Sequence, residues 1–354
     1  MIKKIITIMI IFFSSIYSLD YNYLKTMNEQ DIETLKIAGI EVKESFKNLN
    51  INWYDSEVNL FNYGVKLLEE EHDIYNASRI FSYLTTNYKA EIYLFYLGKC
   101  YYMMAEHYYE GYNEKYYRMA YDIFEKLYDK NDKNIEYLRW YSYSSAKLGN
   151  FIRDKEKGKL SGLSYLRKSI SINSDILDDF NKNDEDALIT EAEYQAETDD
   201  VPIFGGSLKK AYKIIDKVLS INPNSLRANM VKGKFLYKYA KNYGESIKYL
   251  KKAIEIYDNG LVEKNIVNKY IRIFLDMHLV RVYNYIGDSA NSFLHLKSHL
   301  SMLPRSISGL NALIDHLEKV EKNKSKACIV AKRLASLNPY WSKKDETIKR
   351  VCIN

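Results

Sequence analysis

The sequence predicts an all-α protein built as an irregular α-solenoid, in which antiparallel helix pairs stack in series. Apolar residues recur at steps of three and four along most of the chain, which is the period of one side of an α-helix. A spacing of four, three and five residues occurs three times, and each copy ends in a proline, which cannot continue a helix. Four prolines and fourteen glycines in 354 residues are few for an all-β fold with many turns.

The first eighteen residues have the pattern of a secretory signal peptide. Lys3 and Lys4 precede an apolar run from Ile5 to Phe13, and small residues lead to Ser18. The run is too short to span a membrane stably, and no second run of spanning length follows. We therefore expect cleavage after Ser18, export to the periplasm or the exterior, and no stable membrane insertion of the mature chain.

Charge argues against nucleic acid as a partner. The net charge of +6 falls to +4 once the two lysines of the signal peptide are removed, leaving 50 basic against 46 acidic residues. Nucleic-acid-binding domains usually concentrate a large basic excess on one surface. An exported chain so close to charge balance is therefore expected to bind protein rather than nucleic acid.

Residues 19–50 have a weak helical stripe and predict one N-terminal helix that leads into the repeats. Residues 51–173 predict an N-terminal block of three helix pairs, each combining a small residue on one helix with large residues on the next. The residues that mark these pairs are Leu60, Tyr63, Gly64 and Leu67 with Ala77, Phe81 and Leu84; Leu94, Leu97, Gly98 and Tyr101 with Ala120, Phe124 and Leu127; and Leu138–Gly149 with Gly162–Ser169.

Residues 174–200 interrupt this rhythm with eleven acidic residues and one lysine. A run of like charges is usually solvated, so we expect an acidic insertion, either a loop or an outer helix, between two repeat blocks. A calcium-binding loop starting at Asp179 is excluded, because the glycine position holds Asp184 and the twelfth position holds Thr190 instead of Glu.

Residues 201–342 predict the C-terminal block, and residues 343–354 a tail. The clearest unit runs from Val201 to Asp258, with Gly233 on one predicted helix and Ser246, Leu250 and Ala253 on the next. The three copies of the four, three, five spacing lie in this block: Ala211, Ile215, Val218 and Pro223; Ser292, Leu296, His299 and Pro304; and Ala327, Ala331, Leu334 and Pro339.

These small and large positions resemble the tetratricopeptide repeat, a helix-turn-helix unit of about 34 residues. The resemblance covers most of residues 51–340 and implies six or seven helix pairs stacked in a right-handed solenoid. In such stacks the first helix of each pair lines the concave face, which implies a protein or peptide partner on that face.

Three cysteines do not make a disulfide framework. Cys100 and Cys328 lie on helical stripes and are expected to pack as small apolar groups. A bridge between Cys328 and Cys352 is possible in an oxidising compartment, and the sequence leaves the question open.

No catalytic constellation is present, so we expect neither an enzyme nor a bound cofactor or metal. His295 and His299 lie four residues apart, but two ligands without a third make a poor metal site. Gly205-Gly206-Ser207 opens a predicted helix and could hold an anion, yet no phosphate-binding glycine motif surrounds it. A hydrolase appended to the repeats would need a free segment of about 50 residues or more, which the sequence lacks.

The leading hypothesis is an exported, non-catalytic scaffold that binds a protein or peptide on its concave face. The helical phase suggests a set of polar and aromatic contact residues: Asn62, Lys66, Tyr102, Arg139, Tyr143, Lys232 and Tyr239.

The alternative comes from a narrower resemblance. The run Val201–Asn224 resembles a segment of helical periplasmic components that accompany TRAP-type solute transporters, which implies ligand handling for a transporter. In that case the tyrosines between Tyr101 and Tyr121 would line an apolar cavity.

Overall fold

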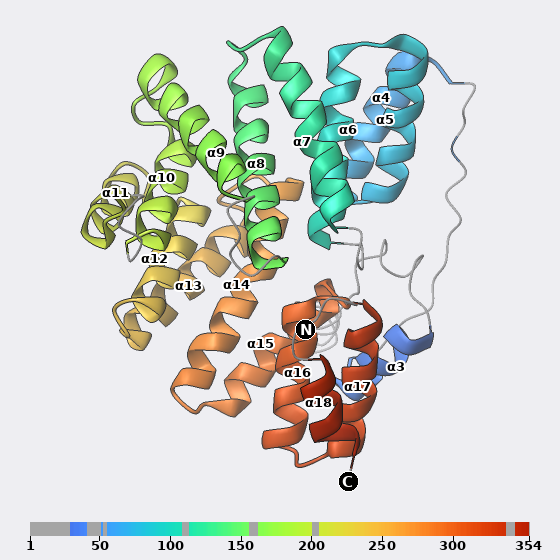
Figure 1. The fold of residues 1–354 in the computed structure, drawn as a ribbon, viewed down its shortest axis with the longest axis vertical. Helices are drawn as coiled ribbons and strands as arrows, with labels where there is room; N and C mark the ends of the chain where they lie inside the picture. Colours follow the sequence, from blue (N-terminus) through green and yellow to red (C-terminus); the bar gives the residue numbers. More distant parts are fainter. Residues whose placement is uncertain are drawn as a thin grey trace, which may run out of the picture. The chain divides into compact units, whose positions relative to one another are not determined.

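The computed structural model describes residues 29–40, 51, 55–107, 113–155, 162–199, 205–337 and 344–353 (Figure 1). Over these residues the chain forms sixteen α-helices and no strand, and successive helices pair antiparallel as predicted. The predicted signal peptide, residues 1–18, lies outside the described residues, and so does Pro339.

The chain divides into two compact units, and the division falls inside helix α14 (Ile266–Tyr285). Unit 2 consists of Trp53–Glu106 and Tyr112–Arg272, and unit 1 consists of Met1–Asn52, His107–Gly111 and Ile273–Asn354. Unit 1 therefore combines the N-terminal and C-terminal parts of the chain, which the linear order of sequence blocks does not suggest.

The described part of unit 2 holds ten helices, of which only α6 extends by one residue, His107, into unit 1, and they pair in chain order. Their bounds are α4 (Glu57–Glu69), α5 (Ile74–Tyr88), α6 (Glu91–His107), α7 (Asn113–Lys130), α8 (Ile135–Lys155), α9 (Leu163–Asp175), α10 (Glu185–Glu197), α11 (Leu208–Ile221), α12 (Leu226–Lys238) and α13 (Tyr243–Asp258). A π-helical turn, Ile176–Phe180, follows α9 directly.

Glycines allow the two helices of a pair to approach closely, as the repeat pattern predicted. A Cβ atom on Gly98 of α6 would lie 2.8 Å from the Phe124 ring of α7, and one on Gly233 of α12 would lie 2.7 Å from Leu250 of α13. Gly64 meets Phe81 in the same way between α4 and α5. Since these large partners are fully buried, each glycine is required by its neighbour's side chain.

The interpretation of residues 174–200 as a solvated insertion is wrong over α10. Asp184 caps this helix by accepting the N–H of Ala187, and the apolar side of α10 packs in one core with α11 and α12. Ile189 and Ala192 are fully buried there. Alanine and isoleucine four and three residues apart make one apolar stripe, while the acidic residues occupy the remaining sides. The stack therefore continues through this segment without a break.

Unit 1 contains α3 (Glu29–Ile37), the rest of α14, α15 (Ser289–Met302), α16 (Ile307–Lys319), α17 (Lys324–Leu337) and α18 (Lys344–Cys352). Helix α3 belongs to the predicted N-terminal segment, and it packs against α17, some 300 positions further along the chain. Leu35 of α3 joins the hydrophobic core of α15, α16 and α17.

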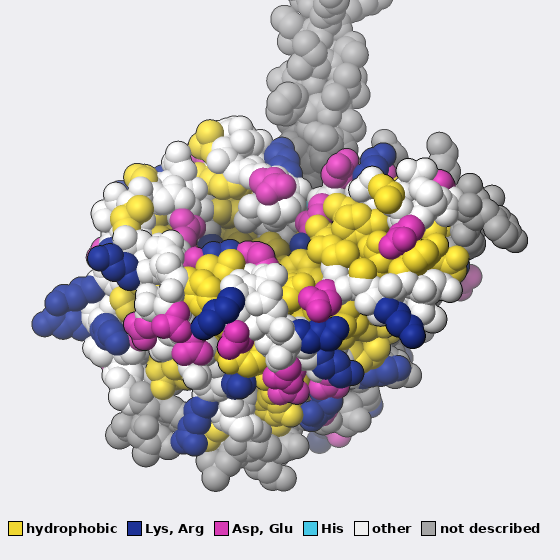
Figure 2. All heavy atoms as spheres, turned by 90° about the horizontal axis from the view of Figure 1, so that it is seen from above, with side chains coloured by type: hydrophobic (Ala, Val, Ile, Leu, Met, Phe, Trp, Pro, Cys, Tyr) yellow, Lys and Arg dark blue, Asp and Glu magenta, His cyan; other side chains and the backbone are white. Residues whose placement is uncertain are grey.

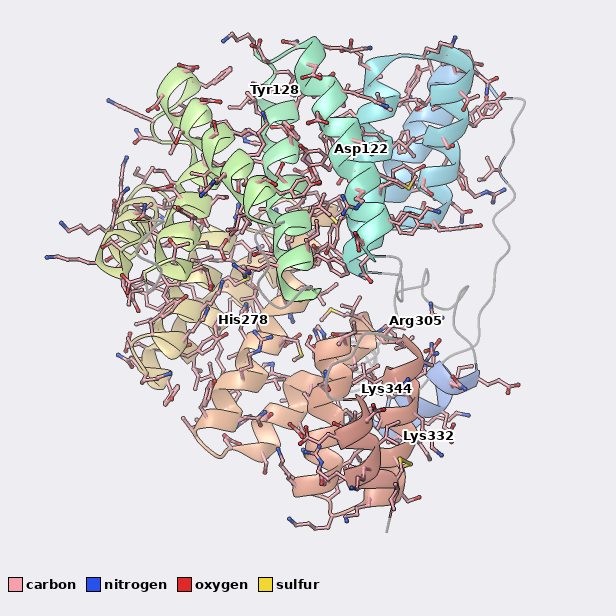
Figure 3. All side chains as sticks on the ribbon, in the orientation of Figure 1. Asp122, Tyr128, His278, Arg305, Lys332 and Lys344 are labelled. Carbon is pink, nitrogen blue, oxygen red and sulfur yellow. A yellow bond between two sulfur atoms is a disulfide. The ribbon has the colours of Figure 1, made fainter. Side chains whose placement is uncertain are left out.

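A buried aspartate fixes α3 in unit 1. The Asp31 carboxylate accepts from Arg333 of α17 at 2.8 Å and from Arg305 at 2.9 Å, and Arg305 lies in the turn between α15 and α16 (Figure 3). Asp31 is 2% exposed and Arg333 is 5% exposed. Both arginines therefore have a charged partner where water is excluded.

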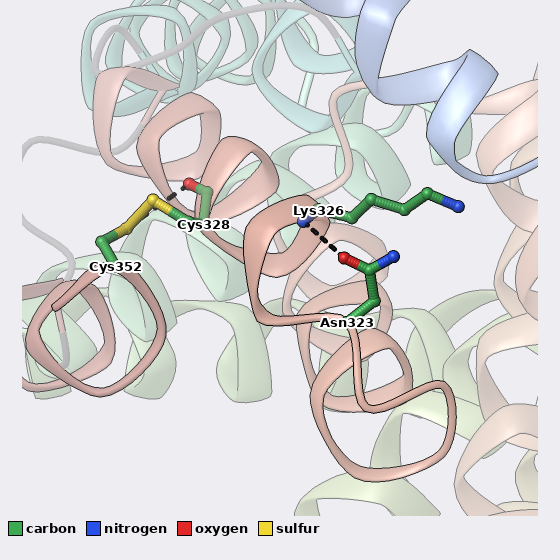
Figure 4. The surroundings of a disulfide bond; sticks show 4 residues. All are labelled: Asn323, Lys326, Cys328 and Cys352. Carbon is green, nitrogen blue, oxygen red and sulfur yellow. Dashed lines mark hydrogen bonds between the residues drawn. A yellow bond between two sulfur atoms is a disulfide. The ribbon is translucent and has the colours of Figure 1, made fainter. Parts of the chain in front are cut away.

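The question of Cys328 and Cys352 is settled by a disulfide. It joins α17 to α18 with the Cα atoms 4.9 Å apart (Figure 4). The third cysteine, Cys100, is free and buried in α6, as its place on a helical stripe predicted.

A candidate interaction surface on the first helices

The first helices of successive pairs in unit 2 are bridged by a ladder of ion pairs, which we call the charged row. It joins α12 to α10: Arg227 to Asp186 at 3.0 Å, Lys234 to Glu193 at 3.2 Å, and Lys238 to Glu197 at 2.7 Å. Each basic residue follows its acidic partner by 41 positions. Because both sets have helical spacing, each occupies a single side of its helix.

Arg227 also connects the charged row to α8. Its guanidinium donates to Thr190 at 3.0 Å, to Glu193 at 3.2 Å and to the Tyr143 hydroxyl at 3.4 Å. The guanidinium carbon lies 5.5 Å from the centre of the Tyr143 ring. Side chains of α8, α10 and α12 therefore meet on one side of the stack.

The electrostatics of the charged row favour the ionised state of its carboxylates. Burial by itself raises the pKa of Glu193, but Lys234 and Arg227 reverse this effect and lower the pKa to about 2. Burial likewise opposes the charge on Lys234, while Glu193 and Glu197 raise the pKa of that lysine overall. Glu193 and Lys234 therefore both stay charged at neutral pH.

Part of the charged row remains in contact with solvent. The side chains of Lys238 and Glu197 are 40% and 38% exposed, whereas that of Arg227 is 18% exposed. The space-filling view shows basic and acidic side chains interspersed on the surface (Figure 2). The row is thus a line of acids on α10 beside a line of bases on α12, and a partner could reach its exposed members.

A second group of first-helix side chains holds the beginning of α14. Glu69 of α4 accepts the N–H of Ile266 at 3.2 Å, and Glu106 of α6 accepts from the hydroxyl of Tyr270. Lys147 of α8 pairs with Glu106 at 2.9 Å and lies 5.5 Å from the Tyr270 ring. A carboxylate at a helix N-terminus is favourable because the helix dipole is positive there. In unit 2 these polar groups are therefore engaged by the chain itself.

Lys99 of α6 lies among aromatic rings. Its ammonium is 5.1 Å from the Tyr96 ring and 5.3 Å from the Trp140 ring, and it pairs with Glu69. This arrangement stabilises a cation by ring faces and a carboxylate together. The lysine fills the space, so this cluster serves the packing of α6 against α4 and α8.

The predicted contact residues fall into three groups. Asn62 and Lys66 lie exposed on α4, and Lys66 pairs with Glu71. Arg139 and Tyr143 of α8 lie next to the first helices that follow, through Asp184 and Arg227. The structure brings these two near the charged row.

Of the remaining three, Tyr239 also borders the charged row, since the Lys238 ammonium lies 4.9 Å from the centre of its ring. Tyr102 is 7% exposed and packs against Tyr117 and Trp140. Lys232 pairs with Asp216 of α11 at 2.7 Å, and the ring of Tyr239 packs on Phe235. Helical phase alone did not separate the side of α12 that faces α10 from the side that faces α11.

The described tyrosines between Tyr101 and Tyr121 pack between helices. Tyr102 and Tyr117 are buried with ring centres 6.3 Å apart, and Tyr121 packs against Tyr141 at 5.2 Å. The hydroxyl of Tyr117 donates to Glu106 at 2.7 Å. These rings fill the interface of α6, α7 and α8 and do not support a ligand cavity. Three other members of the cluster, Tyr108, Tyr109 and Tyr112, lie outside the described residues.

His299 has a structural role. It is fully buried, its Nδ1 lies 3.0 Å from the carbonyl oxygen of Ile273, and its Nε2 lies 2.7 Å from the hydroxyl of Ser306. Burial lowers the pKa of His299 to about 4, which keeps the ring neutral. His295 instead contacts Asp276 at 2.7 Å. The two histidines therefore have separate partners.

The Gly205-Gly206-Ser207 turn is occupied by the chain's own carboxylate. Asp199 accepts the N–H of Leu208 at 2.7 Å, and the Ser207 hydroxyl accepts the N–H of Lys210. The Asp199 carboxylate therefore occupies the position at the start of α11 that an external anion would use, and the role of the turn is to position α11.

The described residues lack two further features. Among them, no group of three or more His, Cys, Asp or Glu side chains is placed to hold a metal ion. Within the same ranges, no helix is both long and apolar enough to cross a membrane.

Sequence reasoning missed Arg227, Lys234, Asp186 and Glu193. A usable signal was present, since an acid is followed by a base 41 residues later three times over. That offset is the distance between equivalent positions of α10 and α12. The interpretation of residues 174–200 as an insertion concealed this offset of 41 residues, because it did not assign the acidic residues to the first helix of a pair.

No protein-family model matches the sequence, and no curated protein matches it. Among solved structures, a tetratricopeptide repeat protein from Parabacteroides merdae is similar over 84% of this chain and 98% of its own, with 15% identity and a TM-score of 0.49. A thermophilic repeat protein from Thermus thermophilus is similar over 64% of this chain and 99% of its own, with 15% identity and a TM-score of 0.47.

Yeast Tom70 is similar over 92% of this chain and 69% of its own, with 12% identity and a TM-score of 0.49. These likenesses concern the fold alone. The pairing of successive helices in the described residues itself agrees with the expected repeat architecture. The relation to components of TRAP-type transporters stays a prediction.

Proposed function

We propose that this chain is an exported, non-catalytic scaffold that binds a protein partner across the first helices of unit 2. The charged row carries the proposal. Side chains of α8, α10 and α12 are held in place by mutual ion pairs, and the outer members remain about 40% exposed. A surface that is already ordered loses little conformational entropy on binding, which favours recognition of a partner.

The balance of charge indicates the kind of partner. Three acids on α10 face three bases on α12, so a strongly acidic or basic ligand would meet repulsion as well as attraction. We therefore propose a folded protein or peptide of mixed charge. Export is motivated by the pattern of residues 1–18, and the proposal of a non-catalytic role by the missing catalytic motifs.

A charge swap tests the binding surface. Exchanging Glu197 and Lys238 (E197K/K238E) reverses the exposed pattern and keeps that pair, but it also replaces the contact of Glu197 with Lys234, 3.1 Å long, by a contact between two lysines. The matched control exchanges Asp315 and Lys319, an exposed pair 3.3 Å apart on α16 (D315K/K319D). Cross-linking of the mature protein in envelope extract, followed by mass spectrometry, should recover a protein partner with the wild type and the control.

We expect at least a tenfold lower yield of that partner with E197K/K238E. Equal recovery with both swaps would reject the charged row as the interface. Recovery of no reproducible protein partner would reject the scaffold function. Export is tested separately by the N-terminus of the mature chain: we expect Leu19 in the envelope fraction, and an intact Met1 in the cytosol would contradict it.

A further inference from the structure

Helix α17 is held between helices from the two ends of the chain. Helix α3 contacts it through Asp31 and Arg333, and α18 contacts it through the Cys328–Cys352 disulfide (Figure 4). One attachment is ionic and buried, and the other is covalent. Helix α17 is therefore attached to α3 by an ion pair, which we call the Asp31 lock, and to α18 by a disulfide.

Apart from the disulfide, α18 is held by Val351, which joins the core of α15, α16 and α17, and by Arg350, which pairs with Asp315 and Glu318. It has nine residues, of which Thr347 and Val351 are buried. An isolated helix shorter than about 12 residues is marginal in water. The ion pair of Arg350 with Glu318 is 3.1 Å long but involves an arginine side chain that is 41% exposed, so it contributes little.

We propose that Cys328 and Cys352 form a redox latch: α18 stays docked on α17 while the disulfide is intact and detaches when it is reduced. Both cysteines are half-buried, so a dithiol reagent can reach the bond. One thiolate of the dithiol attacks a latch sulfur and forms a mixed disulfide, releasing the other cysteine thiolate. The second thiolate of the dithiol then releases the remaining cysteine, so that two electrons pass to the latch and the dithiol becomes a disulfide.

The latch acts independently of the Asp31 lock. The Asp31 lock joins α3 to Arg333 of α17 and to Arg305 in the turn before α16, whereas the latch joins α17 to α18. Side chains without shared partners contribute to stability independently. Reduction should therefore free α18 and leave α3 in place.

The inference deepens the proposed export, because disulfides persist in oxidising compartments and are reduced in the cytosol. The inference rests on the proposed function in one respect only, namely that the compartment in which the disulfide forms depends on export. The latch can be tested on the purified full-length chain whether or not a binding partner is known. Failure to find a partner therefore leaves this test unaffected.

Hydrogen exchange measured by mass spectrometry tests the proposal on the purified full-length chain. The samples are the air-oxidised protein, the same protein treated with a phosphine reductant, and the variant Cys352→Ser. Cys100→Ala is the matched control, since it removes the remaining thiol and leaves the latch intact. Alkylation of the oxidised protein should modify neither Cys328 nor Cys352.

We expect hydrogen exchange in α18 to become about 100-fold faster after reduction or in Cys352→Ser. Without the disulfide, α18 is free to leave α17 and unfold. Exchange in α3 should change less than about twofold by the independence of separate sites. Asp31→Asn should give the reverse, fast exchange in α3 and retained protection in α18. Unchanged protection of α18 after reduction would overturn the proposal, and so would alkylation of both latch cysteines in the oxidised protein.

Discussion

Individual buried polar residues determine how unit 1 is held together. Asp31 and His299 are both inside the molecule, and each satisfies groups from distant parts of the chain. Asp31 neutralises two arginines, whereas His299 remains neutral and joins α15 to the cap of α16. Substitutions at either residue should be destabilising, because a buried polar group that loses its partner cannot form a hydrogen bond with water instead.

Replacing Asp31 with asparagine should destabilise the protein strongly. The change leaves Arg333 and Arg305 without their carboxylate in a buried setting, and breaking a buried ion pair typically costs about 3–5 kcal/mol. Urea unfolding monitored by circular dichroism measures the loss. Asp129→Asn, on the exposed side of α7, is the control. A loss below about 1 kcal/mol for Asp31→Asn would match a surface pair and contradict the assignment.

His299 should make stability depend on pH. Its pKa is lowered to about 4 in the fold, against about 6.5 in the unfolded chain, so between these values the unfolded state binds the extra proton. Stability is therefore complete above about pH 6.5 and falls as the pH drops towards 4. Unfolding midpoints between pH 5 and 7 measure the slope. His299→Gln should be less stable but should show a smaller slope, and an unchanged slope would assign the effect to other groups.

At the scale of helices, the pairing depends on glycines placed opposite large side chains. Gly64, Gly98 and Gly233 each face a buried Phe or Leu of the next helix, and the space between them leaves no room for a methyl group. Gly244 is different, since nothing lies within 4 Å of the place where its Cβ would be. Glycines in one protein can therefore have opposite effects on stability.

Gly233→Ala should be destabilising and Gly244→Ala stabilising. A Cβ at position 233 would lie 2.7 Å from the fully buried Leu250, and overpacking of this kind costs about 1–3 kcal/mol. At position 244, in the first turn of α13, alanine removes the flexibility of glycine and should add up to about 1 kcal/mol. Thermal unfolding of the two variants side by side gives the comparison. Equal effects would show that α12 and α13 are not in close contact.

At the scale of the whole molecule, two sets of long-range contacts complete the units. In unit 2, Glu69, Glu106 and Lys147 hold the beginning of α14, which follows them by more than 100 residues. In unit 1, α3 joins α17. Each unit is thus completed by a segment that is remote in sequence, and its stability should depend on those contacts.

Glu106→Gln should loosen the beginning of α14. Glu106 accepts from Tyr117 and Tyr270 and pairs with Lys147, and hydrogen bonds to a charged group contribute about 1.5–3 kcal/mol. Hydrogen exchange should become faster at residues 266–272. Glu114→Gln, which removes an exposed pair with Arg118, is the control and should change stability by less than about 1 kcal/mol. Equal exchange in both variants would contradict the proposed role of Glu106.

The repeat pattern could be predicted from the sequence, and the candidate interaction surface could be predicted only in part. Ala77, Phe81, Ala120 and Phe124 were assigned to helix pairs from their spacing, and all four are fully buried. Of the predicted contact residues, Arg139 and Tyr143 lie near the charged row, whereas Tyr102 is in the core. A helix between neighbours buries more than one side, so phase alone does not identify the free side.

The sequence by itself determined the helices and their pairing, because each helix packs chiefly on the next one along the chain and local spacing records that contact. Tertiary structure decided which distant residues meet. Asp31 lies beside Arg333, Cys328 joins Cys352, and α10 belongs to the stack instead of forming an insertion. A contact between helices far apart in the chain, such as that of Asp31 with Arg333, depends on how successive helix pairs turn relative to one another, and that rotation leaves no periodic mark in the two residues.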